Sequence, residues 1–279
     1  MGCNAHEFMD EDNPRAQGEA NKKKALVWTY NWGFSTPSIL QLLLQHAGMS
    51  WANGAVKQGW MRKTGMTSRE RVRVLTLTEK GLAWVEQRSD QLLKYSELDP
   101  HRISPVTIWH NLLAQKLTLH AARRGELKSF MTERVLATKS AQGTKQPDVV
   151  WFSREGERIA VEVELTAKWD RKLDDFVGKT IAALSEGEDG QRPRFDRFEI
   201  LTTSRAIARR YGEAFMPGTS LRVWRDTTKG TATLSHLTEV PDWVHQKVSF
   251  RMISDDGRIL TGPDDTEPSS ADRDAAAAD

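Results

Sequence analysis

The chain has 279 residues, 38% hydrophobic and 28% charged, which predicts a globular protein of one large domain or two ordinary ones. Its single cysteine, Cys3, excludes a disulfide framework and a thiolate zinc site, and it fits a reducing cytoplasm. No apolar run approaches the roughly 18 residues of a membrane helix, and the N-terminus lacks an apolar signal segment. We therefore expect a cytoplasmic protein without a membrane partner; the net charge of +2 favours no other class of partner.

Both ends of the chain differ in composition from the rest. Residues 1–24 end in the basic run NKKK, and residues 262–279 are acidic and lack bulky apolar side chains. Segments of this kind bury too little apolar surface to offset the entropy of ordering. Both are therefore predicted to be disordered tails.

Residues 25–97 are predicted to form a first domain. A helix is expected to begin after Thr36, which suits the N-cap, with Pro37 at the first helical position and Gly48 at its end. A second short helix, with Ser50 as its cap, is followed by a basic loop that runs into an alternating strand. Thr78 then caps an amphipathic helix over residues 79–95.

This order of elements is typical of a winged helix-turn-helix, whose second helix enters the major groove and whose hairpin wing touches phosphates. The candidate DNA-binding residues lie on or after that helix and in the wing: Lys57, Arg62, Lys63, Arg69, Arg71 and Arg73. Neutralised phosphates would supply most of the affinity. The alternative is a protein-binding or dimerising winged helix with a solvated basic loop.

A linker at residues 96–104 precedes a second predicted domain, residues 105–250. Helices are expected at 105–125, around 170–185 and at 205–216, and strands at 127–137, within a hairpin at 147–165 and at 195–204. That order predicts an α/β (α+β) fold with three layers and a mixed sheet. Two more strands are expected at 221–226 and 231–240, and the chain beyond them is not assigned.

The hairpin carries three carboxylates. In the stretch VEVEL at 161–165, apolar residues alternate with Glu162 and Glu164, so both acids share one face of a strand. A turn at 153–157, with Gly156 in an unusual backbone conformation, would place Asp148 opposite Glu162. Cross-strand Cβ atoms lie about 4.5–5.5 Å apart, so the three acids would converge at one end of the hairpin.

A divalent cation would relieve the repulsion among these acids. Hard oxygen ligands suit Mg²⁺ or Mn²⁺, and such an ion can polarise a phosphodiester and activate water. The alternative needs no metal: Pro147 and Asp148 would open a turn, and the glutamates would lie exposed on an edge strand, where charge discourages aggregation.

Pro147 and Asp148, followed by Glu162 and Glu164 in an α/β context, resemble the PD-(D/E)xK nuclease motif. The last motif position, usually lysine, is Glu164 here. A lysine from the following segment could supply the missing charge; the candidates are Lys168, Lys172 and Lys179, of which Lys172 is included in the expected catalytic set.

Together with WHNLLAQ at 109–115 and RKLDDFVGK at 171–179, these residues resemble the MobC-type plasmid relaxases and the plasmid replication-relaxation proteins, over about residues 25–215. The resemblance implies a winged helix joined to a nuclease-like domain and a metal held by Asp148, Glu162 and Glu164. It also implies that His110 and Asn111 lie near the site, and that the activity is strand-specific nicking at a plasmid transfer origin.

The sequence therefore favours a Mg²⁺- or Mn²⁺-dependent DNA relaxase of conjugative mobilisation, acting on double-stranded plasmid DNA. A coupling protein or relaxosome accessory proteins are the expected partners. Metal-bound water is the expected nucleophile, and Tyr211 is a second candidate. The expected catalytic residues are Asp148, Glu162, Glu164, His110 and Lys172.

Two functions without catalysis remain as alternatives. The chain could be a plasmid replication or transcription regulator that binds DNA through its winged helix and uses the nuclease-like fold as a scaffold. It could also be a structural accessory that recruits a separate relaxase.

Overall fold

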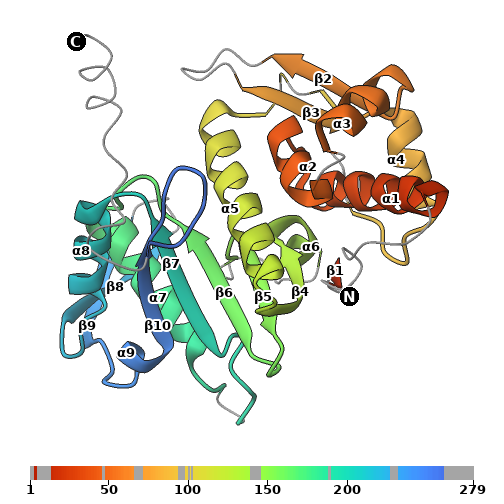
Figure 1. Cartoon of the computed structure of the whole chain (residues 1–279). Coiled ribbons are helices and arrows are strands. Elements are labelled where there is room, and N and C mark those ends of the chain that lie inside the picture. The colour runs from red at the N-terminus through yellow and green to blue at the C-terminus, as the bar shows by residue number, and fades with distance from the viewer. Residues whose placement is uncertain are drawn as a thin grey trace.

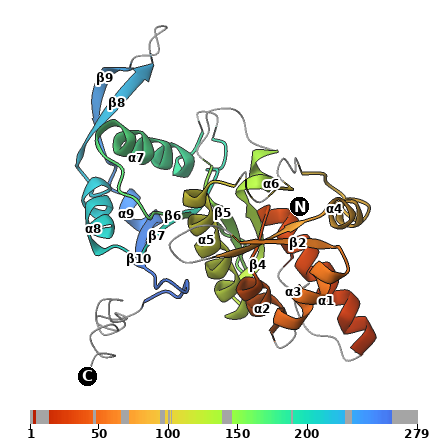
Figure 2. The ribbon, with the colours of Figure 1, turned by 90° about the horizontal axis from the view of Figure 1, so that it is seen from above.

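The structure, a computed structural model, has a mixed α/β fold in which helices cover both faces of a central sheet (Figures 1 and 2). It describes residues 3–4, 14–45, 48–65, 72–93, 98–99, 101, 103–138, 146–187, 190–226 and 232–260. The predicted acidic tail at 262–279 lies outside these residues.

The N-terminal unit is mainly helical and contains a two-stranded sheet. Its elements are α1 (Pro14–Trp32), α2 (Pro37–Leu44), α3 (Gly48–Lys57), β2 (Met61–Gly65), β3 (Arg73–Leu77) and α4 (Glu79–Glu86). Two predicted caps are confirmed: Thr36 Oγ1 accepts from the Ile39 N–H at 3.2 Å, and Thr78 Oγ1 accepts from the Gly81 N–H at 3.2 Å. Both hydroxyls satisfy donors that a helix leaves unpaired at its start.

Four sequence predictions in this unit are wrong. The helix expected over residues 79–95 ends at Glu86, as α4. Residues 14–24 belong to helix α1 and not to a disordered tail. Gly48 begins α3 instead of ending α2, and Ser50 lies inside α3 instead of capping it. The sequence pattern does not predict helix α1, because its buried half is rich in aromatic and β-branched residues, which have weak helix propensity in isolation.

The main sheet is mixed, as predicted. Its six described strands are β1 (Cys3–Asn4), β4 (Leu127–Thr132), β5 (Val149–Ser153), β6 (Arg158–Val163), β7 (Arg197–Thr202) and β10 (Val248–Met252), in that spatial order. The pairs from β1 to β6 are antiparallel, whereas β6–β7 and β7–β10 are parallel. The predicted strand at 127–137 is only half a strand, because helix α6 (Glu133–Ala137) begins after Thr132.

The register predicted for the acidic hairpin is confirmed. Val150 pairs with Ala160 and Phe152 with Arg158, and Gly156 closes the turn at φ 89°. The expectation of glutamates exposed on an edge strand is wrong, because β6 lies between β5 and β7 with both faces covered. A strand buried on both faces tolerates acids only where they have partners.

Helices pack on both faces of the sheet, as Figure 1 shows. Helix α5 (Pro105–Arg123) lies on one face, against the side chains of Val149, Trp151 and Val161. Helices α7 (Asp170–Leu184) and α8 (Arg205–Ala214) contribute to a second apolar cluster with Val150 and Ala160, on the other face. The acids of β6 share this second face by alternation.

The N-terminal unit shares an apolar cluster with the sheet. Trp28 of α1 packs on Phe130 of β4 with a ring-centroid distance of 5.4 Å. Gln115 of α5 accepts from Trp28 Nε1 at 2.8 Å and from Ser35 Oγ at 3.2 Å. The linker predicted at 96–104 therefore separates the two units along the chain, but the two units pack against one another through a shared core.

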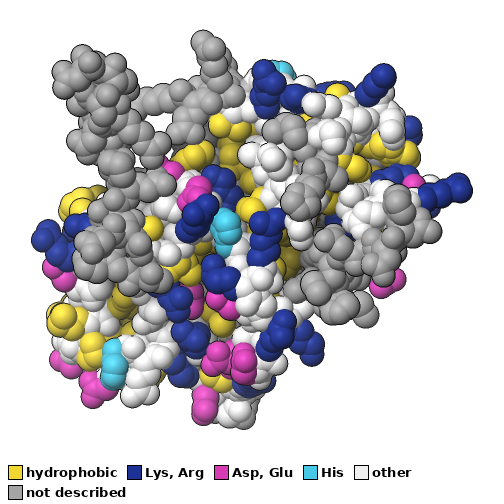
Figure 3. Space-filling view, in the orientation of Figure 1, with side chains coloured by type: hydrophobic (Ala, Val, Ile, Leu, Met, Phe, Trp, Pro, Cys, Tyr) yellow, Lys and Arg dark blue, Asp and Glu magenta, His cyan; other side chains and the backbone are white. Residues whose placement is uncertain are grey.

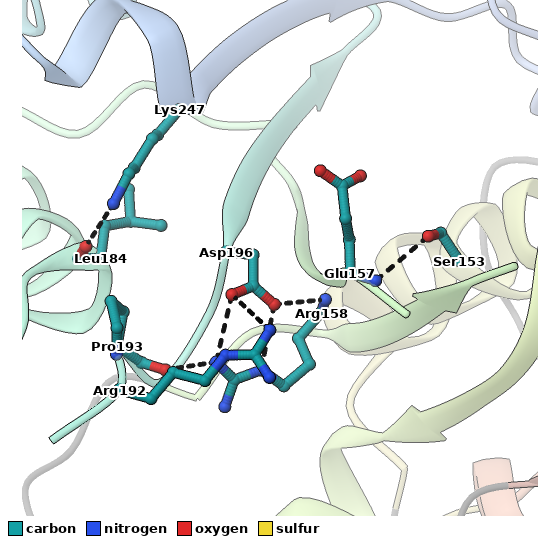
Figure 4. A network of polar contacts seen from close by, with 8 residues as sticks. All are labelled: Ser153, Glu157, Arg158, Leu184, Arg192, Pro193, Asp196 and Lys247. Atoms are coloured by element: carbon teal, nitrogen blue, oxygen red, sulfur yellow. Dashed lines mark hydrogen bonds and ion pairs between the residues drawn. The ribbon is translucent and has the colours of Figure 1, made fainter. Parts of the chain in front are cut away.

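A network of ion pairs and hydrogen bonds lies at the turn end of the β5–β6 hairpin, where β6 begins (Figure 4). Asp196 accepts from the Arg158 backbone N–H at 2.8 Å and from its Nε at 3.1 Å. Burial alone would raise the pKa of Asp196, but the hydrogen bonds and charge of Arg158 outweigh it and lower that pKa to about 2. This pair ties β6 to the start of β7.

The C-terminal part adds a hairpin and the last sheet strand. The predicted strands at 221–226 and 231–240 correspond to β8 (Ser220–Asp226) and β9 (Ala232–Glu239), which form a hairpin that projects beside α7 (Figure 2). Helix α9 (Val244–Lys247) then leads into β10. Neither element is among those predicted from the sequence.

Candidate functional site

The candidate site lies at the edge of the sheet where β6 and β7 end and β5 begins. Because β5 runs antiparallel to β6, Asp148, just before β5, meets the end of β6. Ligands of open α/β sheets bind beside the carboxyl ends of the strands. We call Asp148, Glu162 and Glu164 together the acid site.

Asp148 is held by the end of β6 and by helix α5. Its Oδ2 accepts from the Val163 N–H at 2.7 Å and lies 3.2 Å from His110 Nε2. The same His110 nitrogen contacts the Val163 carbonyl oxygen at 2.5 Å, and Asn111 Oδ1 lies 3.5 Å from His110 Nδ1. His110 and Asn111 therefore lie at the acid site, where the resemblance expected them.

His110 is a cation in this arrangement. Burial would lower its pKa, but the hydrogen bond and charge of Asp148 outweigh burial and raise the pKa to about 9. An imidazolium at neutral pH donates hydrogen bonds and cannot accept a proton. The geometry therefore favours charge balance by His110 over general-base chemistry.

The two glutamates of the acid site are buried. Glu162 is 7% exposed and Glu164 is 5% exposed. The Tyr211 hydroxyl on α8 donates to Glu164 Oε2 at 3.2 Å, and Lys168 Nζ pairs with Oε1. Burial, with the nearby charge of Glu162, raises the pKa of Tyr211 to about 12, so Tyr211 is a poor nucleophile at neutral pH.

The lysine that meets the acids is Lys168 and not Lys172. Lys172 and Lys179 have exposed side chains on α7. Lys168 precedes α7, its backbone N–H donates to the Tyr211 hydroxyl oxygen at 3.2 Å, and its ammonium reaches Glu164. The sequence placed Lys168 among the candidates, but gave no reason to prefer it.

The expected three-ligand metal site is not preformed. Among the residues that the structure describes, no group of three or more His, Cys, Asp or Glu side chains is arranged to hold a metal ion. Both oxygens of Glu164 are hydrogen bonded, and Asp148 faces His110. Mg²⁺ often takes only one or two carboxylates, with waters and phosphate oxygens completing its shell, so the donor chemistry of Asp148 and Glu164 still fits such an ion.

Three of the six predicted DNA-binding residues are exposed on the N-terminal unit. Lys57 ends α3, and Arg62 and Arg73 lie on β2 and β3; all three side chains are exposed. Lys63 is half-buried and donates to Asn53 Oδ1 at 3.3 Å. Arg69 and Arg71 lie outside the described residues. Figure 3 shows Lys and Arg side chains along the upper edge of this unit and also scattered over the part of the molecule that contains the main sheet.

An aromatic–cation pair lies beside the acid site. Trp169, just before α7, lies under the guanidinium of Arg210, 3.6 Å from the ring centroid. No local pattern predicts that these two residues, 41 positions apart, would stack.

None of the described helices combines the length and apolar character needed to cross a bilayer. No protein-family model, curated protein or solved structure matches this chain.

Proposed function

We propose that the protein binds double-stranded DNA through its N-terminal unit and nicks one strand at the acid site, as a relaxase of plasmid mobilisation. The observation that carries the proposal is the placement of Asp148, Glu162 and Glu164 at one strand edge, with Lys168 on Glu164. Those are the residue types of the nuclease motif, with the lysine four positions later than usual.

The order of the elements supports this proposal. The chain runs through helix α5, strand β4, the short helix α6, strands β5 and β6, helix α7 and strand β7. Strands β4, β5 and β6 pair antiparallel and β7 pairs parallel to β6, an order that suits a nuclease-like domain.

The N-terminal unit supports the DNA-binding part. Ser35 bridges Leu75 beside the β2–β3 pair, so α1, this short bridge, α2, α3 and the two strands follow the order of a winged helix. Helix α3 would enter the major groove, and Lys57, Arg62 and Arg73 would neutralise phosphates. A transfer origin as the target, and a coupling protein or relaxosome accessory proteins as partners, are part of the same proposal.

At the acid site, Asp148 and Glu164 are the residues to hold Mg²⁺ or Mn²⁺, with Glu162 beside them. A bound ion of this kind polarises the phosphodiester and activates water. The Lys168 ammonium and the His110 imidazolium lie where they can stabilise negative charge on a phosphate. Tyr211 keeps Glu164 in place through its hydroxyl hydrogen bond.

Conversion of supercoiled plasmid to open circles tests the proposal. The plasmid carries the transfer origin of the element that encodes the protein, and the reactions contain Mg²⁺, Mn²⁺ or chelator. We expect metal-dependent nicking that Asp148→Asn and Glu164→Gln abolish, whereas Glu126→Gln, an exposed carboxylate outside the acid site, retains it. Absence of nicking by the folded wild-type protein with either metal would reject the catalytic part.

A second candidate function is a plasmid replication or transcription regulator without catalytic activity. The observation that favours it is the charge balance of the acid site, since His110 and Lys168 already neutralise two carboxylates. This candidate predicts site-specific DNA binding that survives Asp148→Asn and Glu164→Gln, with no open circles under any metal condition.

A further inference from the structure

Trp169 has an exposed indole next to the acid site. It is 60% exposed, one of the most exposed large apolar side chains in the described part of the chain. The Arg210 guanidinium covers one ring face at 3.6 Å from the centroid. With one face stacked and most of the residue accessible, the rest of the indole is available to a ligand. We call Trp169 and Arg210 the indole platform.

Backbone contacts hold the indole platform in place. Arg210 Nε donates to the Lys168 carbonyl oxygen at 3.0 Å, and the Lys172 N–H donates to the Trp169 carbonyl oxygen at 3.0 Å. Asp170, which follows Trp169, has φ 45°, in the left-handed region that non-glycine residues seldom adopt. Such strain persists where surrounding contacts enforce it, and it is commonest at functional sites.

The indole platform is joined directly to the acid site. Lys168 contributes its carbonyl oxygen to Arg210 and its ammonium to Glu164. Tyr211, next to Arg210 on α8, accepts from the Lys168 N–H and donates to Glu164. A phosphate at the acid site would therefore have the platform as a near neighbour.

We propose that the indole platform stacks an unpaired nucleobase beside the phosphate at the acid site, an inference that rests on the proposed function. An indole face stacks any base, and each base–aromatic contact contributes about 1–3 kcal/mol. The adjacent guanidinium supplies positive charge for the flanking phosphate. Bases in an intact duplex are already stacked on their neighbours, so the preferred ligand is a single-stranded or locally melted segment.

Fluorescence anisotropy with a labelled single-stranded oligonucleotide, in the presence of chelator, tests the platform without cleavage. We expect Trp169→Ala to weaken single-strand binding about 10-fold or more, and Trp169→Phe to restore part of the loss. Duplex binding should change less than about 2-fold, because the N-terminal unit supplies it. Arg210→Lys should weaken single-strand binding, since lysine keeps the charge but loses the planar stack.

Met216→Ala is the matched control. Met216 lies beyond the C-terminal end of α8 and is 58% exposed, so its replacement removes a similarly exposed apolar side chain that is not part of the indole platform. Thermal melting confirms that each variant is folded. Unchanged single-strand affinity in Trp169→Ala, while the wild type binds DNA, would overturn the platform alone; failure of the wild type to bind either form of DNA would overturn the proposed function.

Discussion

At the residue scale, the acid site is governed by charge balance. Asp148, Glu162 and Glu164 lie near the end of β6, and burial of the two glutamates would make their charges costly if they had no partners. The imidazolium of His110 pairs with Asp148, and the ammonium of Lys168 pairs with Glu164. The repulsion that the VEVEL stretch implies is thus relieved by side chains from α5 and from the loop before α7.

Replacing Lys168 tests this balance. Lys168→Ala should destabilise the fold by about 1–2 kcal/mol, because Glu164 is left buried while the lysine itself is only 31% exposed. Nicking should fall by about 10²–10³-fold if the ammonium stabilises the phosphate. Lys172→Ala, on an exposed position of α7, should change stability by less than about 0.5 kcal/mol. Urea unfolding and plasmid nicking measure the two effects, and equal behaviour of the variants would contradict the assignment of Lys168.

A second residue pair predicts the response to acid. The pKa of Asp196 is lowered from 3.8 to about 2 in the folded chain. Its contribution to stability is therefore fully present above about pH 3.8 and is lost as the pH falls through about 2. Asp196→Asn should cost about 1–2 kcal/mol at pH 6 and should flatten the dependence of unfolding free energy on pH between about 4 and 2. Denaturant titrations across that range measure it; parallel curves for variant and wild type would refute it.

At the element scale, close packing decides where helices sit. Helix α4 packs closely against Trp60, the residue just before β2. A Cβ atom added to Gly81 would lie 2.2 Å from the Trp60 carbonyl oxygen. A glycine inside a helix usually lowers stability, so its presence in α4 reflects this contact. The N-cap at Thr78 and the close approach at Gly81 together fix α4 against the β2–β3 pair.

Gly81→Ala should therefore destabilise the protein by about 2 kcal/mol or more, although alanine is the better helix former. Gly54→Ala is the matched control, because nothing lies within 4 Å of the added Cβ in α3. That change should be neutral or stabilising by up to about 1 kcal/mol. Thermal melts measure the stability of both variants. A stabilised Gly81→Ala variant would show that α4 does not pack this tightly.

At the scale of the whole molecule, the N-terminal unit and the sheet are expected to behave as one folding unit. Trp28, Phe130 and the side chains around Gln115 form a continuous core that joins them. Gln115 also donates to the Phe34 carbonyl oxygen at 3.0 Å, so both ends of its amide are engaged across the boundary. If the N-terminal unit binds DNA as we propose, that DNA would therefore be held at a fixed position relative to the acid site.

This shared core predicts a single cooperative unfolding transition. Gln115→Leu, which leaves Trp28 Nε1 and Ser35 without their acceptor, should lower the stability of the whole chain by about 2–3 kcal/mol. Calorimetry and circular dichroism should show one transition for both proteins. Two separate transitions, with only one shifted by the substitution, would show that the units unfold independently.

Features that depend on neighbouring residues follow from the amino-acid sequence alone. Helix caps at Thr36 and Thr78 follow from hydroxyl groups placed before apolar periodicity, and the register of the acidic hairpin follows from alternation around the Gly156 turn. A register shift of one residue would have reversed every side chain on that strand. Local chemistry therefore sufficed for these two caps and for the strand register that brings Asp148 to the end of β6.

The groups that complete the acid site depend instead on long-range packing. Lys168, Tyr211 and His110 come from three different segments, and the choice of Lys168 over Lys172 depends on how the chain turns before α7. The burial of β6 on both faces and the sheet position of β10 likewise depend on segments far apart in the chain. The physical reason is that side-chain pairing and burial are set by packing between distant elements, whereas periodicity, caps and turns are set within a few residues.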